Sequence, residues 1–547
     1  MVRSLFFFLL MLSNCCFAQK LSKSDKETID YLKSNLSYLA SDKLEGRRAG
    51  DKGEKLAAEF IAEKFAENKL VPKGDSNTYI QTFPIFDGKF PDSTTKFTVD
   101  NINLKLFEGF FPFPFSASSN INLEFSPSIN EKDQPWFFDI NELIEQNASN
   151  PHYDIIGGIY ETSKKFKVAG ATAVIFYYSG TGMDPVKYDP KNKDEVLDIP
   201  VFYLTKDNGI PKINDFQKTH NFNISCSIKP SYRYGHNVIG LMDNKAKNTI
   251  IIGAHLDHLG YGQDGNSMVR SGPLAIHNGA DDNASGSSGL IELGFMFKKS
   301  KYKKSNILFI GFSGEELGLN GSKYFTEHPT VSFDSVNYMI NMDMIGRLND
   351  STKVITIGGF GTSPVWSSRL TSIKTTLSIK TDSSGTGPSD HTSFYRKNIP
   401  VLFFFTGLHT DYHKPTDDAE KINYLGLYSI LQYIHNLIKA DNGIDKIPFL
   451  KTREQQTSTS ARFSVSLGIM PDYSFNQTGV RVDGVSDNRP AKSAGIIPGD
   501  IILQVGDFKT SSVEAYMQAL SKFKKGDKTQ VIYSRKGIQT TVPIEFK

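Results

Sequence analysis

The stretches TIIIGAHLD at residues 249–257 and NILFIGFSGEE at residues 306–316 decide the fold of this 547-residue chain. Each is an apolar run, rich in isoleucine or phenylalanine, that ends in histidine or acidic side chains. Between them, SGLIELGFMFKK at residues 288–299 is typical of a helix. Fully apolar strands that alternate with helices are typical of a mostly parallel, helix-covered sheet. The sequence therefore predicts an α/β fold.

The strand pattern extends beyond these two stretches, with further apolar runs at residues 237–242, 337–346, 353–358 and 399–405. Upstream, apolar residues recur at helical spacing over residues 22–40 and 53–68, which predicts two helices. The segment SDKLEGRRAG at residues 41–50 is polar and contains glycine, so we expect a loop between the two helices.

The changes in composition along the chain predict several domains. We assign residues 20–100 and 234–445 to one discontinuous domain that contains the sheet. Residues 101–233 are rich in Phe, Pro and Asn and alternate strand-like runs with a helix, which predicts an inserted α/β module. We assign residues 446–462 to a linker, because KTREQQTSTSAR at residues 451–462 is polar and poor in apolar side chains. Residues 463–547 combine short strands with one helix at their centre, which predicts a small separate domain.

Composition and charge exclude several classes of protein. Hydrophobic residues make up 39% and charged residues 22% of the chain, which excludes a disordered or collagen-like protein. The net charge of +3 gives no reason to expect nucleic acid or an anionic membrane as a partner. Three cysteines cannot build a disulfide framework.

The first 19 residues have the pattern of a secretory signal peptide. Arg3 precedes an apolar run, and small residues follow around Ala18. The run is shorter than the ~20 residues of a transmembrane helix, and no other stretch is long and apolar enough to be one. We therefore expect export to the periplasm or the medium. A lipoprotein anchored at Cys15 is the alternative, although Asn14 stands where a small residue is preferred.

Acidic and histidine side chains follow the predicted strands in five clusters: His255 with Asp257, Asp281 with Asp282, Glu315 with Glu316, Asp343, and Tyr412 with His413. Loops at the carboxyl ends of parallel strands converge on one crevice, so these side chains should meet. Carboxylates and imidazoles gathered there require a positive partner. Their nitrogen and oxygen atoms suit zinc, and a carboxylate that bridges two ions would make a two-metal site.

A serine hydrolase is the chemical rival of a metal site. Its G-x-S-x-G turn is absent from the sequence. Neither a phosphate-binding Walker loop nor a dinucleotide fingerprint occurs at a strand-to-helix turn.

The clusters lie in motifs that resemble the co-catalytic zinc aminopeptidases of the bacterial leucyl-aminopeptidase type. These motifs are HLDHLG (255–260), GADDNASG (279–286), SGEELGLNGS (313–322), NMDMIGR (341–347) and DYHKPTDD (411–418). The resemblance covers roughly residues 25–95 and 234–445. The same superfamily includes glutamate carboxypeptidases and glutaminyl cyclases.

The resemblance implies five metal ligands. His255 and Asp343 would hold one zinc ion, and Glu316 and His413 would hold the other. Asp282 would bridge the two ions. Manganese or cobalt could replace zinc in such an oxygen-rich pair.

It also implies three residues that act beside the metals. Glu315 would be the general base, which takes a proton from water and returns it to the leaving amine. Tyr412 would donate a hydrogen bond to the developing oxyanion. Asp257 would orient the imidazole of His255. We interpret Asp281 and His258 as structural, and the family segment Ser389-Asp390-His391 as part of the pocket wall.

Two accessory domains also resemble known modules. Residues 101–233 are similar to a protease-associated domain, through KVAGATAVIFYY and IPVFYL. Residues 463–547 resemble a PDZ domain, whose carboxylate-binding loop would include Leu467, Gly468 and Ile469. Ser466 replaces the usual first glycine of that loop. Its groove would bind protein or peptide C-termini, with domain packing as the alternative.

Together these features predict an exported dizinc aminopeptidase that removes N-terminal residues from peptides. The alternatives are a carboxypeptidase or glutaminyl cyclase of the same superfamily, and a non-catalytic peptide-binding protein built around an inactive core. A cyclase is disfavoured because it typically uses one zinc ion, whereas all five ligand positions are filled here. We predict neither the preferred N-terminal residue nor the oligomeric state.

Overall fold

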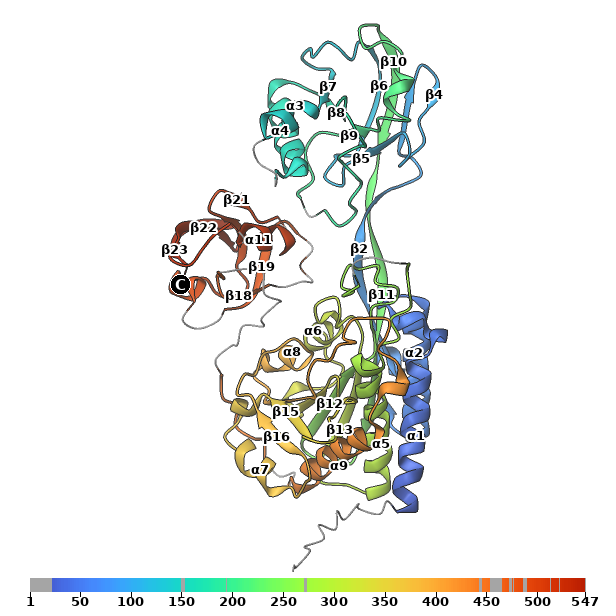
Figure 1. Cartoon of the computed structure of the whole chain (residues 1–547), viewed down its shortest axis with the longest axis vertical. Coiled ribbons are helices and arrows are strands. Elements are labelled where there is room, and N and C mark those ends of the chain that lie inside the picture. The colour runs from blue at the N-terminus through green and yellow to red at the C-terminus, as the bar shows by residue number, and fades with distance from the viewer. Residues whose placement is uncertain are drawn as a thin grey trace, which may run out of the picture.

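The computed structural model describes residues 22–546 apart from 149–152, 193, 270–272, 442–444, 453–464, 472–474, 476, 486–488, 512 and 521. Figure 1 shows a large domain, a module at the far end of a two-stranded ribbon, and a C-terminal domain beside them. The predicted signal peptide lies outside the described residues. Among the described residues, no helix combines the length and apolar character needed to cross a membrane.

The large domain is built on a sheet that has nine strands within the described residues. Their order is β1-β11-β13-β12-β14-β17-β15-β16, and β2 pairs with β11. The strands are β1 (Val71–Pro72), β2 (Ile80–Pro91), β11 (Ile228–Met242), β12 (Thr249–His255), β13 (Asn306–Phe312), β14 (Val336–Met342), β15 (Val354–Gly358), β16 (Ser378–Thr381) and β17 (Val401–Phe405).

The predicted parallel sheet is found at the centre of this array and not at its flanks. Strands β13, β12, β14 and β17 are parallel to one another. Strand β11 is antiparallel to both β2 and β13, because it is the return arm of the ribbon that carries the inserted module. Strand β15 is antiparallel to β17 and parallel to β16. The carboxyl ends of the four central strands therefore share one edge.

Alternate residues of the central strands pack into two different layers. Ile250 and Ile252 lie in the core beneath one set of helices, whereas Ile251 lies in the core on the opposite face. The first layer contains α1 (Lys23–Leu39), α2 (Lys52–Glu67), α5 (Gly286–Ser300) and α9 (Tyr424–Ala440), with α7 (Trp366–Ser372) beside α9. The second contains α6 (Asn320–Glu327) and α8 (His391–Tyr395). Burial on both faces explains why these strands are continuously apolar.

The ribbon formed by β2 and β11 leads to the inserted module, residues 96–226, which we call the insert (Figure 1). Its described residues form two four-stranded sheets, β4-β3-β10-β6 and β5-β9-β8-β7. Their strands are β3 (Lys96–Val99), β4 (Ile102–Asn103), β5 (Phe110–Pro112), β6 (Ser119–Phe125), β7 (Pro135–Asp139), β8 (Ala173–Tyr177), β9 (Val201–Leu204) and β10 (His220–Cys226), with helices α3 (Asn141–Gln146) and α4 (Ile155–Ala169). Gly170 ends α4 in the left-handed region, at a φ of 111°, as the predicted helix-turn-strand requires.

The C-terminal domain has a sheet whose described part contains six strands. Its elements are β18 (Ile469–Pro471), β19 (Val480–Val485), α10 (Pro490–Ser493), β20 (Ile501–Val505), β21 (Phe508–Lys509), α11 (Val513–Leu520), β22 (Lys528–Arg535) and β23 (Ile538–Glu545). The first part of the predicted linker is not free: Ile447 is buried, and the Leu450 N–H donates to the carbonyl of Thr362. Residues 453–462 of that prediction lie outside the described residues.

Glu292, on α5, is a fully buried carboxyl group in the large domain. Neither of its oxygens has a hydrogen-bond partner among the described residues. Burial raises its pKa to about 8, and Lys299 opposes the shift only in part. The folded protein therefore holds this group neutral at pH 7.

Replacing Glu292 with glutamine should flatten the pH dependence of stability. Between its ordinary pKa near 4.5 and the folded value near 8, the unfolded chain loses this proton and the folded chain keeps it. The free energy of unfolding of the wild type should fall over this window by up to ~1.4 kcal/mol per pH unit relative to Glu292→Gln. Urea denaturation at pH 5 and pH 8 measures the difference. An equal gap between the two proteins at both pH values would contradict the assignment.

Candidate metal centre

The predicted site residues meet at the shared carboxyl edge of the central strands. His255 is the last residue of β12, Glu315 and Glu316 follow β13, and Asp343 follows β14. His413 lies in the loop after β17, and Asp282 lies in the turn that leads into α5. The topology thus brings together side chains that are up to 158 residues apart, from His255 to His413.

The first group of ligand atoms surrounds His255. Its Nε2 lies 3.3 Å from Oδ1 of Asp282 and 3.3 Å from Oδ1 of Asp343. The three side chains are buried, and their ligand atoms all lie within 4.8 Å of one another. These three residues are the ones that the sequence predicts for the first metal ion.

The second group surrounds His413. Its Nε2 lies 3.3 Å from Oδ2 of Asp282 and 3.2 Å from Oε2 of Glu316. The two oxygens of Asp282 therefore face two different imidazoles, as a bridging carboxylate must.

These spacings fit two zinc ions. A ligand atom lies about 2.0–2.1 Å from zinc, so two ligands at the tetrahedral angle lie about 3.3–3.4 Å apart. The four distances that join His255 and His413 to their carboxylates are 3.2–3.3 Å. Direct hydrogen bonds between nitrogen and a carboxylate are usually shorter, at about 2.7–2.9 Å. The described residues thus leave room for one ion between each imidazole and its two carboxylates.

The carboxylates of the site also favour a positive charge beside them. Although burial opposes it, the neighbouring carboxylates raise the pKa of His413 to about 11 and that of His255 well above its ordinary value. Burial likewise opposes ionisation of Glu316, yet the charge of His413 and hydrogen bonds hold its pKa at about 2. Without metal, the two imidazoles are therefore protonated at neutral pH.

Zinc binding should consequently release protons. An imidazole must be neutral to ligate a metal, so loading two ions at pH 7 should displace at least two protons, one from each ligand histidine. Titration calorimetry in two buffers with different ionisation enthalpies counts these protons. The zinc affinity should fall as the pH is lowered. Binding with no proton release at pH 7 would contradict this arrangement of ligands.

Asp257 supports the site in two ways. Its Oδ1 lies 3.7 Å from Nδ1 of His255, and its backbone carbonyl lies closer, at 3.2 Å. Its carboxylate also accepts the backbone N–H groups of Glu315, at 3.1 Å, and Glu316, at 3.4 Å. Asp257 therefore fixes the turn that carries Glu315 and Glu316, in addition to lying beside His255 as predicted.

Glu315 and Tyr412 both border the open side of the site. Burial raises the pKa of Glu315 well above its ordinary value, and Asp343 and Glu316 add to the shift. Glu315 is thus suited to hold a proton between two steps of a reaction. The ring of Tyr412 stacks on His413 with centroids 3.9 Å apart. Burial and the nearby carboxylates raise the pKa of Tyr412, so its phenol stays protonated and can donate.

Several positioning residues were not predicted from the sequence. Asp417 accepts the backbone N–H groups of Asp281 and Asp282, at 2.8 and 3.1 Å, and so holds the bridging residue in place. The carbonyl of Asn266 lies 2.9 Å from Nδ1 of His413 and accepts a hydrogen bond from it. Asp417 lies inside the DYHKPTDD motif, so the sequence could have indicated its role. Asn266 acts through its backbone carbonyl, which no side-chain pattern in the sequence indicates.

Two further predicted segments lie close to the metal ligands. Asp281, which we interpreted as structural, accepts the Gly346 N–H at 2.6 Å. Ser389, Asp390 and His391, predicted to shape the pocket wall, are fully buried and do not line the cavity. The imidazole of His391 stacks on Phe403, 4.5 Å away between centroids, because the segment opens α8 inside the second layer. It supports the wall without lining it.

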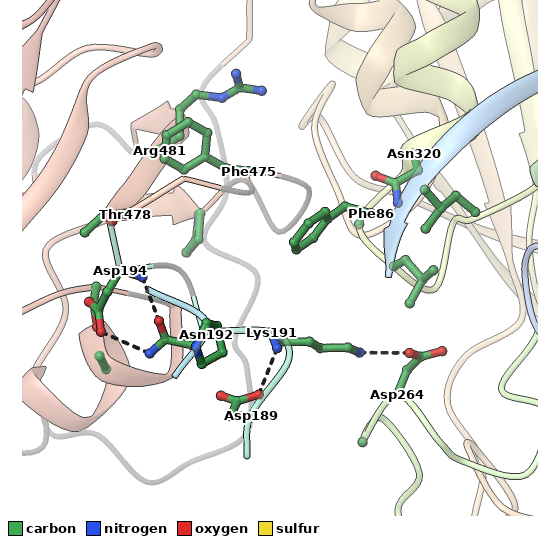
Figure 2. Close-up of a pocket in the computed structure, with 18 of the residues that line it drawn as sticks. Phe86, Asp189, Lys191, Asn192, Asp194, Asp264, Asn320, Phe475, Thr478 and Arg481 are labelled. Carbon is green, nitrogen blue, oxygen red and sulfur yellow. Dashed lines mark hydrogen bonds and ion pairs between the residues drawn. The ribbon is translucent and has the colours of Figure 1, made fainter. Parts of the chain in front are cut away.

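The site opens into a cavity of about 1560 Å³. Figure 2 shows part of its lining, with Phe475 and Arg481 of the C-terminal domain across from Asn320 of the large domain. The insert contributes Lys191, whose Nζ lies 2.9 Å from Asp264 (Figure 2). The cavity is larger than the roughly 300–1,000 Å³ of typical small-molecule pockets, which suits a peptide.

The predicted carboxylate-binding loop of the C-terminal domain is well formed. Gly468 has a φ of 78°, and a Cβ there would clash with Arg489. The hydroxyl of Ser466 accepts the Gly468 N–H at 3.0 Å, so the residue that departs from the usual loop sequence caps it. Leu467 and Ile469 are buried in the domain core, so only their backbone groups are suited to a ligand.

Comparison with known proteins places these features in families. Residues 237–438 match peptidase family M28. The chain carries a peptidase family M28 domain. Residues 456–546 match the PDZ domain family, so the C-terminal domain is a PDZ domain. All five predicted metal ligands of the M28 domain lie within the matched range.

Relatives with known names cover part of the chain. Aminopeptidase YwaD of Bacillus subtilis (strain 168) is 26% identical over 280 residues, 48% of this chain and 56% of that protein. Leupeptin-inactivating enzyme 1 of Streptomyces exfoliatus is 30% identical over 192 residues, 34% of this chain and 39% of that protein. The chain thus spans about half the length of these relatives or less. The solved structure of BSAP, a zinc aminopeptidase from Bacillus subtilis, is 21% identical in sequence to this chain. The match covers 77% of this chain and 98% of that one, with a TM-score of 0.41.

Proposed function

We propose that this protein is an exported dizinc aminopeptidase that hydrolyses N-terminal residues from peptides. The observation that carries the proposal is the bridging position of Asp282, whose two oxygens each lie 3.3 Å from a different imidazole. A two-metal hydrolase uses such a bridging carboxylate, and the M28 domain match and the named aminopeptidase support the proposal. Residues 1–19 support export.

The ligand set suits zinc at both positions. His255, Asp282 and Asp343 would hold one ion, and Asp282, Glu316 and His413 would hold the other. When bound, the ions supply Lewis acidity and lower the pKa of water toward about 7. Three protein ligands for each ion leave a position open for substrate or water.

The chain's own residues then perform the acid-base steps. Glu315 accepts a proton from the attacking water and returns it to the leaving amine, for which a raised pKa is suitable. Tyr412 donates its phenol proton in a hydrogen bond to the substrate carbonyl oxygen as that oxygen becomes negative. Asp257 holds the turn that carries Glu315, and Asp417 holds the turn that carries the bridging carboxylate.

The accessory domains are proposed to select the substrate. The insert, which we propose to be a protease-associated domain, and the PDZ domain both line the cavity above Glu315. Such walls favour short or unfolded peptides over folded proteins. The PDZ loop at Gly468 is proposed to bind peptide C-termini through backbone N–H groups.

Peptide pairs with free and acetylated N-termini test the proposed activity. The purified, zinc-loaded protein should release the first amino acid of the free peptide and leave the acetylated one intact. Release of the C-terminal residue from both peptides would make it a carboxypeptidase. Loss of ammonia from an N-terminal glutamine without cleavage would make it a cyclase. Absence of both turnover and stoichiometric metal would favour a peptide-binding protein.

A further inference from the structure

His258 is a buried histidine whose ring faces the second metal position. It follows Asp257 in the HLDHLG motif and is 2% exposed. Its Nδ1 lies 2.7 Å from Oε1 of Glu316. Its Nε2 has no hydrogen-bond partner among the described residues. The polar contacts of this ring are thus directed at the metal centre.

The ring is held in this position by its surroundings. The His258 backbone N–H donates to the carbonyl of Arg47 at 3.0 Å. A Cβ at Gly279 would lie 2.4 Å from the ring, so the ring packs against backbone in the turn that leads to Asp282. This packing restricts rotation of the ring and keeps Nδ1 beside Glu316.

Distances distinguish a hydrogen-bond donor from a metal ligand. His413 Nε2 lies 3.2 Å from Oε2 of Glu316 and 3.3 Å from Oδ2 of Asp282, which is the spacing of two ligands on one zinc ion. His258 Nδ1 lies 2.7 Å from Oε1 of Glu316, which is a hydrogen-bond length, and 3.9 Å from Oδ2 of Asp282, which is longer than the spacing around His413. The ligand atoms of His258, Asp282 and Glu316 also lie within 4.8 Å of one another, so a metal ligand is the alternative role that the substitutions below test. The two histidines also contact different oxygens of Glu316, Oε1 for His258 and Oε2 for His413.

We propose that His258 is a positioning residue for the second metal ion, an inference that rests on the proposed dizinc site. Its Nδ1–H donates to Oε1 of Glu316 and so presents Oε2 as the single ligand atom of that carboxylate. A ligand carboxylate whose outer oxygen is hydrogen-bonded keeps one orientation, and loss of such a partner typically lowers metal affinity 10–100-fold. The effect should be confined to the second ion, because among the described residues the ion pairs of His258 involve Glu316 and the shared Asp282 but neither His255 nor Asp343.

Two substitutions separate the donor from a ligand or a packing role. Asparagine places an amide N–H near the position of Nδ1, whereas leucine fills the space without a donor. We expect His258→Leu to weaken binding of one of the two zinc ions 10–100-fold in a chelator competition titration, with the other affinity unchanged. His258→Asn should bind both ions within a few-fold of the wild type. His435→Leu, which removes a buried histidine that packs against Phe297, should change neither affinity.

The outcomes are distinct for each part of the account. If His258→Leu binds both zinc ions with wild-type affinity, the role of His258 is overturned and the dizinc site stands. If His258→Asn loses one ion as completely as His258→Leu does, the ring is a metal ligand and the donor role is overturned. A wild type that binds fewer than two ions would overturn the dizinc site itself and this inference with it.

A measurement on the wild type tests the proposal even if His258→Leu fails to fold. In the zinc-loaded protein labelled with ¹⁵N-histidine, Nδ1 of His258 should carry a proton, and its resonance should be absent from His258→Asn. A ligating nitrogen carries no proton, so an unprotonated Nδ1 would overturn the proposal.

Discussion

Replacing Glu315 with glutamine is expected to lower kcat by a factor of about 10²–10⁴ while both zinc ions stay bound. Glutamine has nearly the same shape but accepts no proton from water at neutral pH. Glu315 is not among the atoms spaced for metal binding, so its loss removes proton transfer and not the ions. Turnover of an unblocked peptide and zinc content should be measured on the same sample.

Two matched variants make this result specific. Glu316→Gln alters the neighbouring carboxylate, which contacts His413, and should lower zinc content together with turnover. Glu327→Gln alters an exposed carboxylate at the cavity rim and should leave both unchanged. A Glu315→Gln protein with wild-type turnover would contradict the assignment of the base.

Replacing Arg47 with methionine is expected to lower the free energy of unfolding by at least ~3–5 kcal/mol. This side chain is 1% exposed and donates only to backbone carbonyls. Its Nε reaches Leu256 at 2.8 Å, and its other nitrogens reach Asn278 at 2.7 Å, Gly279 at 3.0 Å, and Leu39. Methionine fills similar space but removes the Arg47 donors from four backbone oxygens, of which the Gly279 oxygen still accepts the Ala284 N–H.

The same substitution should also weaken metal binding. Arg47 ties together the segments around His255 and Asp282, because Leu256 follows the former and Gly279 precedes the latter. Urea denaturation of the metal-free protein and a zinc titration separate the two effects. Lys43→Met, an exposed change in the same loop, should alter stability by less than about 1 kcal/mol. A stable Arg47→Met protein with wild-type zinc affinity would contradict the role of this network.

The sequence predicted the central sheet and the acidic and histidine clusters at its edge because both depend on short-range patterns, whereas the assignment of five metal ligands came from the family resemblance. An apolar strand followed directly by a charged side chain, as at His255 or Asp343, places that side chain at the carboxyl edge of the sheet. The direction of β11 could not be predicted in this way, because it depends on the ribbon that carries the insert. The polar stretch at residues 451–462 likewise concealed that residues just before it, Ile447 and Phe449, pack on the large domain.

The missed residues act through partners far away in the chain. Arg47 lies in a polar segment that indicates an exposed loop, yet its acceptors at Leu256 and Gly279 are 209 and 232 residues away. His258 was interpreted as structural because its partner Glu316 lies 58 residues further along. Such pairs become visible only when the fold brings them together.

The central claim is that two metal ions share Asp282, and crystals of the zinc-loaded protein test it most directly. Diffraction data on both sides of the zinc absorption edge locate the ions without any assumption about activity. The account predicts two anomalous peaks about 3.5–4 Å apart on either side of Asp282, one beside His255 and one beside His413. A single peak, or peaks at which Asp282 contacts only one ion, would contradict it.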